Sequence, residues 1–330
     1  MSTSLKTEGL VVVGAHTILG ELLIEQLEAN PDIEKFWVID LHPPTRGKFK
    51  KLQFIKMNLT QPAADALLAE KLKEIGAKTL VHCALKNNPS HNPGDAHELE
   101  VIGTINILSA LKAAQLTKFV VCSTTMVYGA SPKNPNYISE SAPLASHPES
   151  HFVRDKVDAE KQIAALQSDE PTIKVSVLRF ALIVGPRSEN YFTELLRRPI
   201  VPTLLGYDPL LQFIHEEDAV YALLLATFGD YAGVFNIVGK GVIPLSYALR
   251  EAGKINFPVA PFFAYPFIQV LWNFNISSMP GKLLDYFRYL WVADGEKARE
   301  VMKFNPKYSS KEAFLDLAKN VRIQEFSWAQ

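Results

Sequence analysis

"LVVVGAHTILGELL", residues 10–23, decides the fold of this chain. A short aliphatic run leads into Gly14, and a second glycine, Gly20, follows six residues later at the start of a helical pattern. A tight turn after a strand needs the first glycine, and close packing of a helix against that strand explains the second. The free N–H groups and the dipole of a helix that begins here favour a bound pyrophosphate.

A carboxylate follows at the end of the next strand-like run, "FWVID" (36–40), where Asp40 lies twenty residues beyond the second glycine. There it can bind both hydroxyls of an adenosine ribose and would repel a 2′-phosphate. The pattern therefore favours NAD over NADP, although Arg46 and two lysines follow closely. The alternative is that Asp40 is only a turn or capping residue.

Short runs rich in β-branched and aromatic residues alternate with longer helical stretches. Because these runs are nearly continuous in apolar character, we expect strands buried on both faces, as in a parallel sheet. The helical stretches, such as "ILGELLIEQLEAN", carry apolar residues at three- and four-residue spacing. The sequence predicts an α/β fold, a Rossmann-type doubly wound parallel sheet with helices on both faces. The expected strands are 10–14, 36–40, 53–57, 79–83, 118–123, 174–180 and 233–238.

The regular alternation of strand-like and helical stretches ends at about residue 185, after which prolines begin to cluster. We expect a nucleotide-binding Rossmann domain over residues 1–185 and a smaller, mostly helical substrate lobe over residues 186–330. Late elements of the sheet, at about 212–240, are expected to interrupt this lobe.

Composition excludes several classes of protein. The net charge of −1 over 330 residues argues against a nucleic-acid partner. Cys83 and Cys122 form no metal-ligand pattern, so we expect no metal site, and so few cysteines fit a reducing compartment, the cytoplasm. The N-terminus, "MSTSLKTEG", has no apolar segment, so we expect no secretory signal.

The most apolar stretch is "FPVAPFFAYPFIQVLWNFNI", Phe257 to Ile276. It is about as long as a membrane span. Three prolines break its first half, and Gln269 and two asparagines interrupt its second half. We therefore expect a buried helix of the C-terminal lobe and no transmembrane span. An apolar substrate wall and a peripheral membrane patch are the alternatives.

Eight stretches occur in the order found in the extended short-chain dehydrogenase/reductase family, and they resemble its NAD-dependent epimerase/dehydratase group over nearly the whole chain. "HFVRDKVDAEK" lies where that family has a Tyr-x-x-x-Lys helix, and "CSTTMVYGA" resembles its Ser-Ser-x-x-Val-Tyr-Gly motif. The others are "GAHTILG", "VHCAL", "EVIGTINILSALKAA", "VLRFALIVGP", "LQFIHEEDAVYALLLA" and "FNIVGKG".

The resemblance implies a role for each matching residue. Asp40 would hold the adenosine ribose, Thr124 would hydrogen-bond the reacting oxygen, and Lys156 would bind the nicotinamide ribose. The implied pyrophosphate cradle is Gly14, His16, Thr17, Ile18 and Gly20. Asn58 and Leu59 would lie against the adenine, with Cys83 and Ala84 lining the cofactor cleft. A small-molecule substrate and a homodimer are further expectations from the resemblance.

Five residues depart from the family pattern. Thr17 replaces the middle glycine of the loop, and Asn58 replaces a common aspartate. Glu100 replaces the asparagine at a helix start, and Leu182 replaces an asparagine that often contacts a substrate diphosphate. Phe152 replaces the catalytic tyrosine, and a phenyl ring has no proton to give.

Candidates for the missing proton donor are Tyr128, His151 and Glu100, each with a structural role as the alternative. The two cysteines, at the ends of neighbouring strands, are expected to be buried and unreactive. Three functions stay open, and the least favoured is a structural or membrane-associated protein that has lost the cofactor, as Thr17 in the loop could indicate. Of the other two, one is an atypical NAD-dependent oxidoreductase or epimerase-like enzyme acting on an apolar substrate that is not a nucleotide sugar. The other is a non-catalytic dinucleotide-binding sensor or scaffold.

Overall fold

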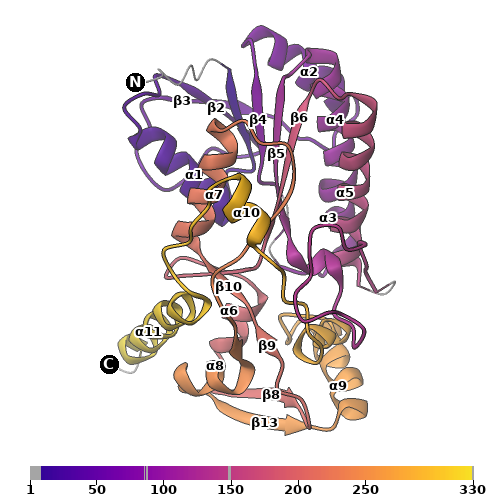
Figure 1. Cartoon of the computed structure of the whole chain (residues 1–330), viewed down its shortest axis with the longest axis vertical. Helices are drawn as coiled ribbons and strands as arrows, with labels where there is room; N and C mark the ends of the chain where they lie inside the picture. The colour runs from indigo at the N-terminus through magenta and orange to yellow at the C-terminus, as the bar shows by residue number, and fades with distance from the viewer. Residues whose placement is uncertain (1–8, 85, 87, 148–149, 329–330) are drawn as a thin grey trace.

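The computed structural model describes residues 9–84, 86, 88–147 and 150–328. Its centre is a seven-stranded sheet in which every neighbouring pair of strands is parallel (Figure 1). The strand order β11-β6-β5-β4-β1-β2-β3 confirms the predicted doubly wound Rossmann-type fold. The strands are β1 (Leu10–Val13), β2 (Phe36–Asp40), β3 (Leu52–Lys56), β4 (Thr79–His82), β5 (Lys118–Thr124), β6 (Lys174–Phe180) and β11 (Gly233–Ile237).

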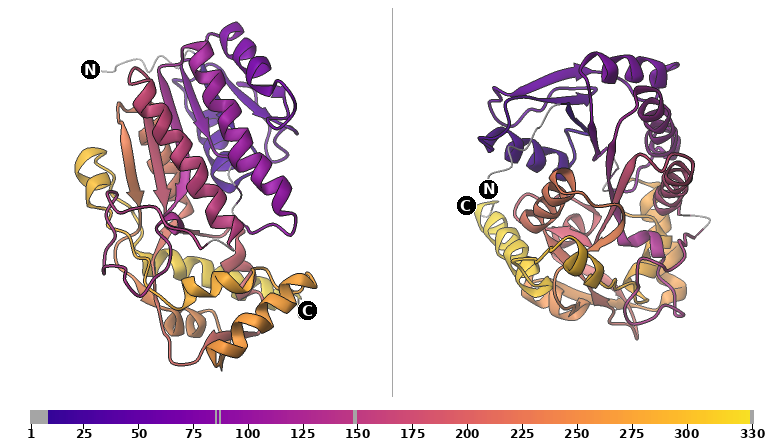
Figure 2. Two further views of the ribbon diagram at one scale, coloured as in Figure 1. Left: turned by 90° about the vertical axis from the view of Figure 1, so that its right-hand side faces the viewer. Right: turned by 45° about the horizontal axis from the view of Figure 1, so that its top comes forward.

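Helices cover both faces of this sheet (Figure 2). One face packs on α1 (Ile18–Ala29) and α7 (Glu216–Phe228), and the other packs on α2 (Ala64–Glu74), α4 (Gly103–Ala114) and α5 (His151–Asp169). Within β1, Val12 belongs to the first core and Val11 and Val13 to the second. Successive side chains of a strand point to opposite faces, so strands between two helical layers are apolar throughout.

The C-terminal lobe combines helices with three two-stranded sheets, β10–β7, β12–β9 and β13–β8. The sequence predicts a mostly helical lobe and misses these strands. Four of them have only two or three residues, and the two longer ones contain Pro202 and Pro258, which argue against a strand. They are β7 (Leu182–Val184), β8 (Ile200–Leu204), β9 (Leu210–Leu211), β10 (Phe213–His215), β12 (Ile243–Pro244) and β13 (Ile255–Val259). The helices are α6 (Tyr191–Leu196), α8 (Leu245–Glu251), α9 (Pro261–Asn273), α10 (Glu296–Val301) and α11 (Ser310–Trp328).

The two parts of the chain interleave. After β10 the chain returns to the sheet as α7 and the edge strand β11. Later it returns again, and Ala298 of α10 packs in the same core as α1 and α7. After α10 the chain re-enters the lobe, where Phe314 of α11 packs against Phe192 and Phe213. The lobe is therefore attached to the Rossmann part by several chain crossings.

Short helical turns connect the larger elements near the carboxyl edge of the sheet. Before α4, the chain forms α3 (Pro93–His97) and then η1 (Glu98–Ile102), which is π-helical. After β5 it forms the 3₁₀ turn η2 (Thr125–Tyr128), and η3 (Gly281–Phe287) follows α9. Isolated π-helical turns occur often at functional sites.

The apolar stretch Phe257–Ile276 corrects one prediction. It contains the end of β13 and all of α9, and it is not a buried helix, since Phe262 is 73% exposed and Phe274 is 72% exposed. Within the residues that the structure describes, no helix is both long enough and apolar enough to span a membrane.

Candidate functional site

The first turn is built around two glycines that cannot be replaced. Gly14 has φ +95°, and a Cβ there would lie 2.4 Å from the backbone nitrogen of Ala84. A Cβ on Gly20 would lie 1.9 Å from the carbonyl oxygen of Gly14. The β1–α1 turn therefore packs directly on the neighbouring strand and on itself, which leaves the first turn of α1 open to a ligand.

Thr17 takes the middle position of this loop without strain. Its backbone is extended, with φ −88° and ψ 153°, so a side chain is tolerated. Its hydroxyl accepts a hydrogen bond from the Gly20 N–H and donates one to the Gly14 carbonyl, both at 3.1 Å. The threonine is thus the N-cap of α1, a role for which its hydroxyl is well suited.

Asp40 lies beside this turn at the end of β2. Its carboxylate accepts hydrogen bonds from the N–H groups of Ala15, at 2.8 Å, and Leu41, at 2.6 Å. Arg46 points elsewhere and pairs with Glu21 at 3.3 Å. A cavity of about 190 Å³ opens at Asp40, and its lining includes Gly14, His16, Thr17, Asn58, Leu59 and Ala84.

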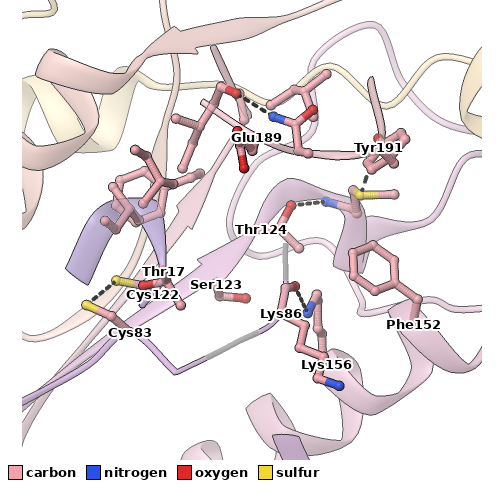
Figure 3. A pocket seen from close by; sticks show the side chains of 18 residues that line it. Thr17, Cys83, Lys86, Cys122, Ser123, Thr124, Phe152, Lys156, Glu189 and Tyr191 are labelled. Atoms are coloured by element: carbon pink, nitrogen blue, oxygen red, sulfur yellow. Dashed lines mark hydrogen bonds between the residues drawn. The ribbon is translucent and has the colours of Figure 1, made fainter. Parts of the chain in front are cut away.

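A narrower apolar cavity continues from the glycine turn toward the C-terminal lobe (Figure 3). The Asp40 cavity, this cavity and an outer one beside Arg187 all share Thr17 and Lys86, so together they form one cleft. The cleft runs along the carboxyl ends of β1, β4 and β5, where ligands bind in open α/β sheets. The inner walls include Ile18, Leu19, Met126, Phe180, Leu182, Ile183 and Tyr191.

Cys83 and Cys122 meet at one end of the inner cavity. Their sulfur atoms lie 3.4 Å apart, and both side chains are buried. Burial raises the pKa of the Cys122 thiol well above its usual value, and the neighbouring Cys83 adds to the effect. A thiol of this kind stays protonated and is a poor nucleophile.

Thr124 ends β5 between the thiols and α5. Its hydroxyl oxygen accepts a hydrogen bond from the Met126 N–H at 3.3 Å, so the hydroxyl proton remains available for a donor bond into the cavity. The side chain is half-buried and lines the cavity.

Phe152 and Lys156 close the other end of the cavity from the first turns of α5 (Figure 3). The Lys156 ammonium lies 4.5 Å from the centre of the Phe152 ring. It donates hydrogen bonds to Glu100 Oε1 at 2.7 Å and to the Lys86 carbonyl at 2.8 Å. The position that would carry a phenol therefore carries a phenyl ring, and the lysine is held by a carboxylate from another helix.

Glu100 lies within the π-helical turn η1, not at a helix start as the sequence predicts, because α3, η1 and α4 follow one another without a break. Its side chain is 2% exposed. Oε1 also accepts the Lys86 N–H at 2.8 Å, whereas Oε2 has no hydrogen-bond partner among the described residues. Burial raises the pKa of the Glu100 carboxyl, and Lys156 opposes that rise.

Glu100 also faces a second cavity, on the lobe side of Phe152. This cavity has a volume of about 350 Å³ and includes Asp155, Gln269 and Trp272 in its lining. Asp155 is buried and accepts a bond from His97 Nδ1 at 3.0 Å. His151, a candidate proton donor, lines this second cavity and not the one that contains Thr124.

Tyr128 does not lie in the cleft, which corrects its candidacy as a proton donor. Its hydroxyl donates to Asn236 Oδ1 at 2.6 Å and accepts a bond from Arg179 at 2.9 Å. Arg179 is in turn paired with buried Glu160 at 2.6 Å. Burial raises the pKa of Tyr128, so the phenol is both occupied and harder to ionise.

The sequence gives no sign of several residues that complete the site. Lys86 contributes its carbonyl and N–H to the Lys156–Glu100 pair, and Glu189, Asn190 and Tyr191 form a wall directly after the sixth-strand motif. In the parts of the chain that the structure describes, no cluster of three or more His, Cys, Asp or Glu side chains is arranged to hold a metal ion.

Comparisons with known proteins agree with this fold. An uncharacterized protein of Mycobacterium tuberculosis is 30% identical over 313 residues, covering 93% of this chain and 82% of that one. The 2-alkyl-3-oxoalkanoate reductase of Shewanella oneidensis is 27% identical over 67% of this chain and 57% of its own length. The decarboxylating sterol-4-alpha-carboxylate 3-dehydrogenase of Homo sapiens is 25% identical over 78% of this chain and 69% of its own length.

Solved structures share the whole architecture. A dTDP-glucose 4,6-dehydratase from Bacillus anthracis superposes with a TM-score of 0.73 at 18% identity, covering 98% of this chain and 99% of that one. A UDP-glucose 4-epimerase from Thermotoga maritima gives 0.71 at 20% identity over 96% and 99% of the two chains. A family profile matches residues 10–237, and by this match the chain belongs to the NAD dependent epimerase/dehydratase family.

Proposed function

We propose that this chain is an NAD-dependent oxidoreductase that acts on an apolar alcohol or ketone, and that the Lys156–Glu100 pair handles the proton that a tyrosine would otherwise carry. The cleft fits NAD. The glycine turn leaves no room for a Cβ beside the first turn of α1, and the Asp40 carboxylate has lone pairs left for a ribose. No cation is hydrogen-bonded to Asp40 among the described residues, which favours NAD over NADP.

One observation supports the redox proposal above the others. A buried ammonium, Lys156, lines the cavity that also contains Thr124, and its counter-ion Glu100 lies behind it. Bound NADH would supply the hydride. The reduction of a ketone also consumes a proton at the developing alkoxide, and Lys156 is a buried charged donor positioned in that cavity.

In this proposal Thr124, Lys156 and Glu100 have separate roles in the proton transfer. Thr124 donates its free O–H to the substrate oxygen, because its own acceptor site is taken by the Met126 N–H. Lys156 transfers a proton to that oxygen. Glu100 lines the second cavity and has a pKa raised by burial, so after this transfer its carboxylate can take up a proton from solvent there and pass it to Lys156. Oxidation of an alcohol would run these steps in reverse.

The substrate we propose is apolar. Leu182 and the aromatic and aliphatic side chains around it line the cavity beside Phe152, and few polar groups reach it. The relatives named for a 2-alkyl-3-oxoalkanoate and for a sterol carboxylate support this class of substrate. A diphosphate sugar would meet a leucine where the resembling enzymes carry an asparagine.

The test measures NADH absorbance with purified protein and a panel of long-chain and steroid-like ketones. We expect turnover in the wild type and a loss of at least about 10²-fold in Lys156→Met, the usual contribution of a positioned acid. Glu100→Gln should shift the pH dependence of kcat and leave KM nearly unchanged. Lys161→Met is the matched control, because Lys161 lies on the same helix with its side chain 62% exposed.

A second function has its own support. The Lys156 ammonium is already engaged by two oxygen acceptors and the Phe152 ring, which suits a binding site better than a site of proton transfer. A non-catalytic NAD sensor would bind NADH in calorimetry, show no turnover with any substrate, and bind equally in Glu100→Gln. That set of results would overturn the redox proposal and leave the sensor.

A further inference from the structure

The far end of the C-terminal lobe carries an apolar surface that no described part of the chain covers, here called the tip patch. On α9 and just after it, Phe262 is 73%, Phe267 54% and Phe274 72% exposed. A single exposed apolar residue is ordinary, but a group this dense marks an interaction surface. The tip patch consists of Ile200, Ile255, Phe257, Phe262, Phe263, Phe267, Val270 and Phe274.

The α9 part of the patch is one continuous face of the helix. At 100° per residue, the exposed side chains from Phe262 to Phe274 fall within an arc of about 140°. Ala264 and Ile268 lie on the opposite side and are buried in the lobe. An exposed apolar arc on an otherwise anchored helix is the reverse of the usual amphipathic arrangement, in which the outer face is polar.

The strand part continues the same surface. Ile200 of β8 is directly opposite Ile255 of β13 in the parallel register, and both are more than half exposed. Phe257 follows two residues later on the same side of β13, with Pro202 opposite it. Figure 1 shows β8, β13 and α9 together at one end of the long axis, away from the seven-stranded sheet.

Charge indicates what covers the tip patch. Residues 195–207 and 252–284, which supply it, contain no aspartate or glutamate. They present Arg197, which pairs with Glu189 at 3.4 Å, and the partly exposed Arg198 and Lys282, whereas Lys254 is buried. Two copies of the chain that met through this surface would bring like charges together. A bilayer that contains anionic headgroups complements both the apolar face and the cations around it.

We infer that the tip patch docks on the surface of a lipid bilayer that contains anionic lipid, with α9 lying in the plane of the interface. No segment needs to cross the bilayer. The inner face of α9 carries Gln269 and Trp272, which line the cavity shared with Phe152 and Glu100. If the proposed function holds, an apolar substrate dissolved in lipid would thus lie one helix away from the site.

The test is flotation of the full chain with vesicles of neutral phosphatidylcholine and with vesicles that also contain phosphatidylglycerol, without cofactor or substrate. We expect binding to both and tighter binding to the anionic vesicles, with the difference reduced by added salt. The variant Phe262→Ser/Phe267→Ser/Phe274→Ser should bind at least about tenfold more weakly, because three aromatic side chains no longer enter the interface. Its matched control, Leu67→Ser/Val301→Ser/Ile323→Ser, changes exposed apolar residues elsewhere and should bind as the wild type does.

Three results would overturn the inference. One is wild type that floats with neither vesicle, and another is a triple phenylalanine variant that binds like its control. The third is a wild-type dimer in light scattering that the same variant converts to monomer, with no vesicle binding. If the variant does not fold, the single variants Phe262→Ser and Phe274→Ser, each at a side chain more than 70% exposed, decide: weaker vesicle binding by both supports docking, and wild-type binding by both refutes it. The flotation test measures vesicle binding and no enzymatic reaction, so a negative result would count against membrane docking and not against the redox proposal.

Discussion

Removing one partner of the Lys156–Glu100 pair should destabilise the protein strongly, whereas removing both should not. The two side chains are 4% and 2% exposed, so either charge alone would be left in a poorly solvated site. Breaking such a pair typically costs about 3–5 kcal/mol, and replacing both partners by apolar residues of similar size is often neutral. We expect about 3 kcal/mol for Glu100→Leu, at the lower end, because Lys156 keeps the Lys86 carbonyl and the Phe152 ring.

Lys156→Met should cost less near neutral pH, about 2 kcal/mol, because the carboxyl left behind can be protonated. Burial already raises the pKa of Glu100, and the variant removes the ammonium that opposes the rise. A carboxyl whose pKa is higher in the folded state binds more protons there than in the unfolded chain. The free energy of unfolding of this variant should therefore fall as pH rises above the usual carboxyl range toward the raised folded pKa.

The assay is urea unfolding followed by far-UV circular dichroism on the wild type, both single variants and the double variant. The double variant should lie within about 1 kcal/mol of the wild type, which gives a coupling energy of several kcal/mol between the two sites. Lys161→Met breaks an exposed pair on the same helix and should change stability by less than about 1 kcal/mol. The interpretation of this pair is refuted if Glu100→Leu is as stable as the wild type, or if the cost of the double variant equals the sum of the single costs.

Three further predictions follow from buried groups around the cleft. Burial lowers the pKa of His82 from 6.5 to about 4, so the unfolded chain binds more protons than the folded protein between these pH values. The free energy of unfolding should therefore fall by about 3 kcal/mol as the pH is lowered from 6.5 to 4. In urea titrations, His82→Gln should make the free energy of unfolding less dependent on pH in this range. Cys83 and Cys122, 2% and 5% exposed, should not react with a thiol reagent in the native protein and should both react in denaturant; rapid native labelling would contradict their burial. Gly20→Ala would place a Cβ 1.9 Å from the Gly14 carbonyl, so calorimetry should show NAD binding weakened by at least about tenfold, and unchanged affinity would mean that the turn is not the cradle.

Much of the fold followed from local pattern. All seven strands of the main sheet were predicted within two residues of their ends, because strands covered on both faces are apolar without interruption. The strands of the lobe were not predicted, because some have only two or three residues and the longer ones, such as β8 with Pro202, contain a proline. The two glycines of the first turn were evident from their positions after a strand-like run, and the structure gives the reason for them: a Cβ at either would collide with the backbone.

The sequence by itself determined the doubly wound sheet, the glycine turn with Asp40 beside it, and the absence of a phenol at Phe152, since each depends on residue identity or on neighbours close in the chain. Only the tertiary structure decided which groups surround the position of the missing phenol and which side chains could take over its role. Glu100 reaches Lys156 across 56 positions, and the Tyr128 hydroxyl is occupied by Asn236 across 108. The exposed face of α9 is also a tertiary result, because the apolar composition of a segment is the same whether the lobe buries it or leaves it outside.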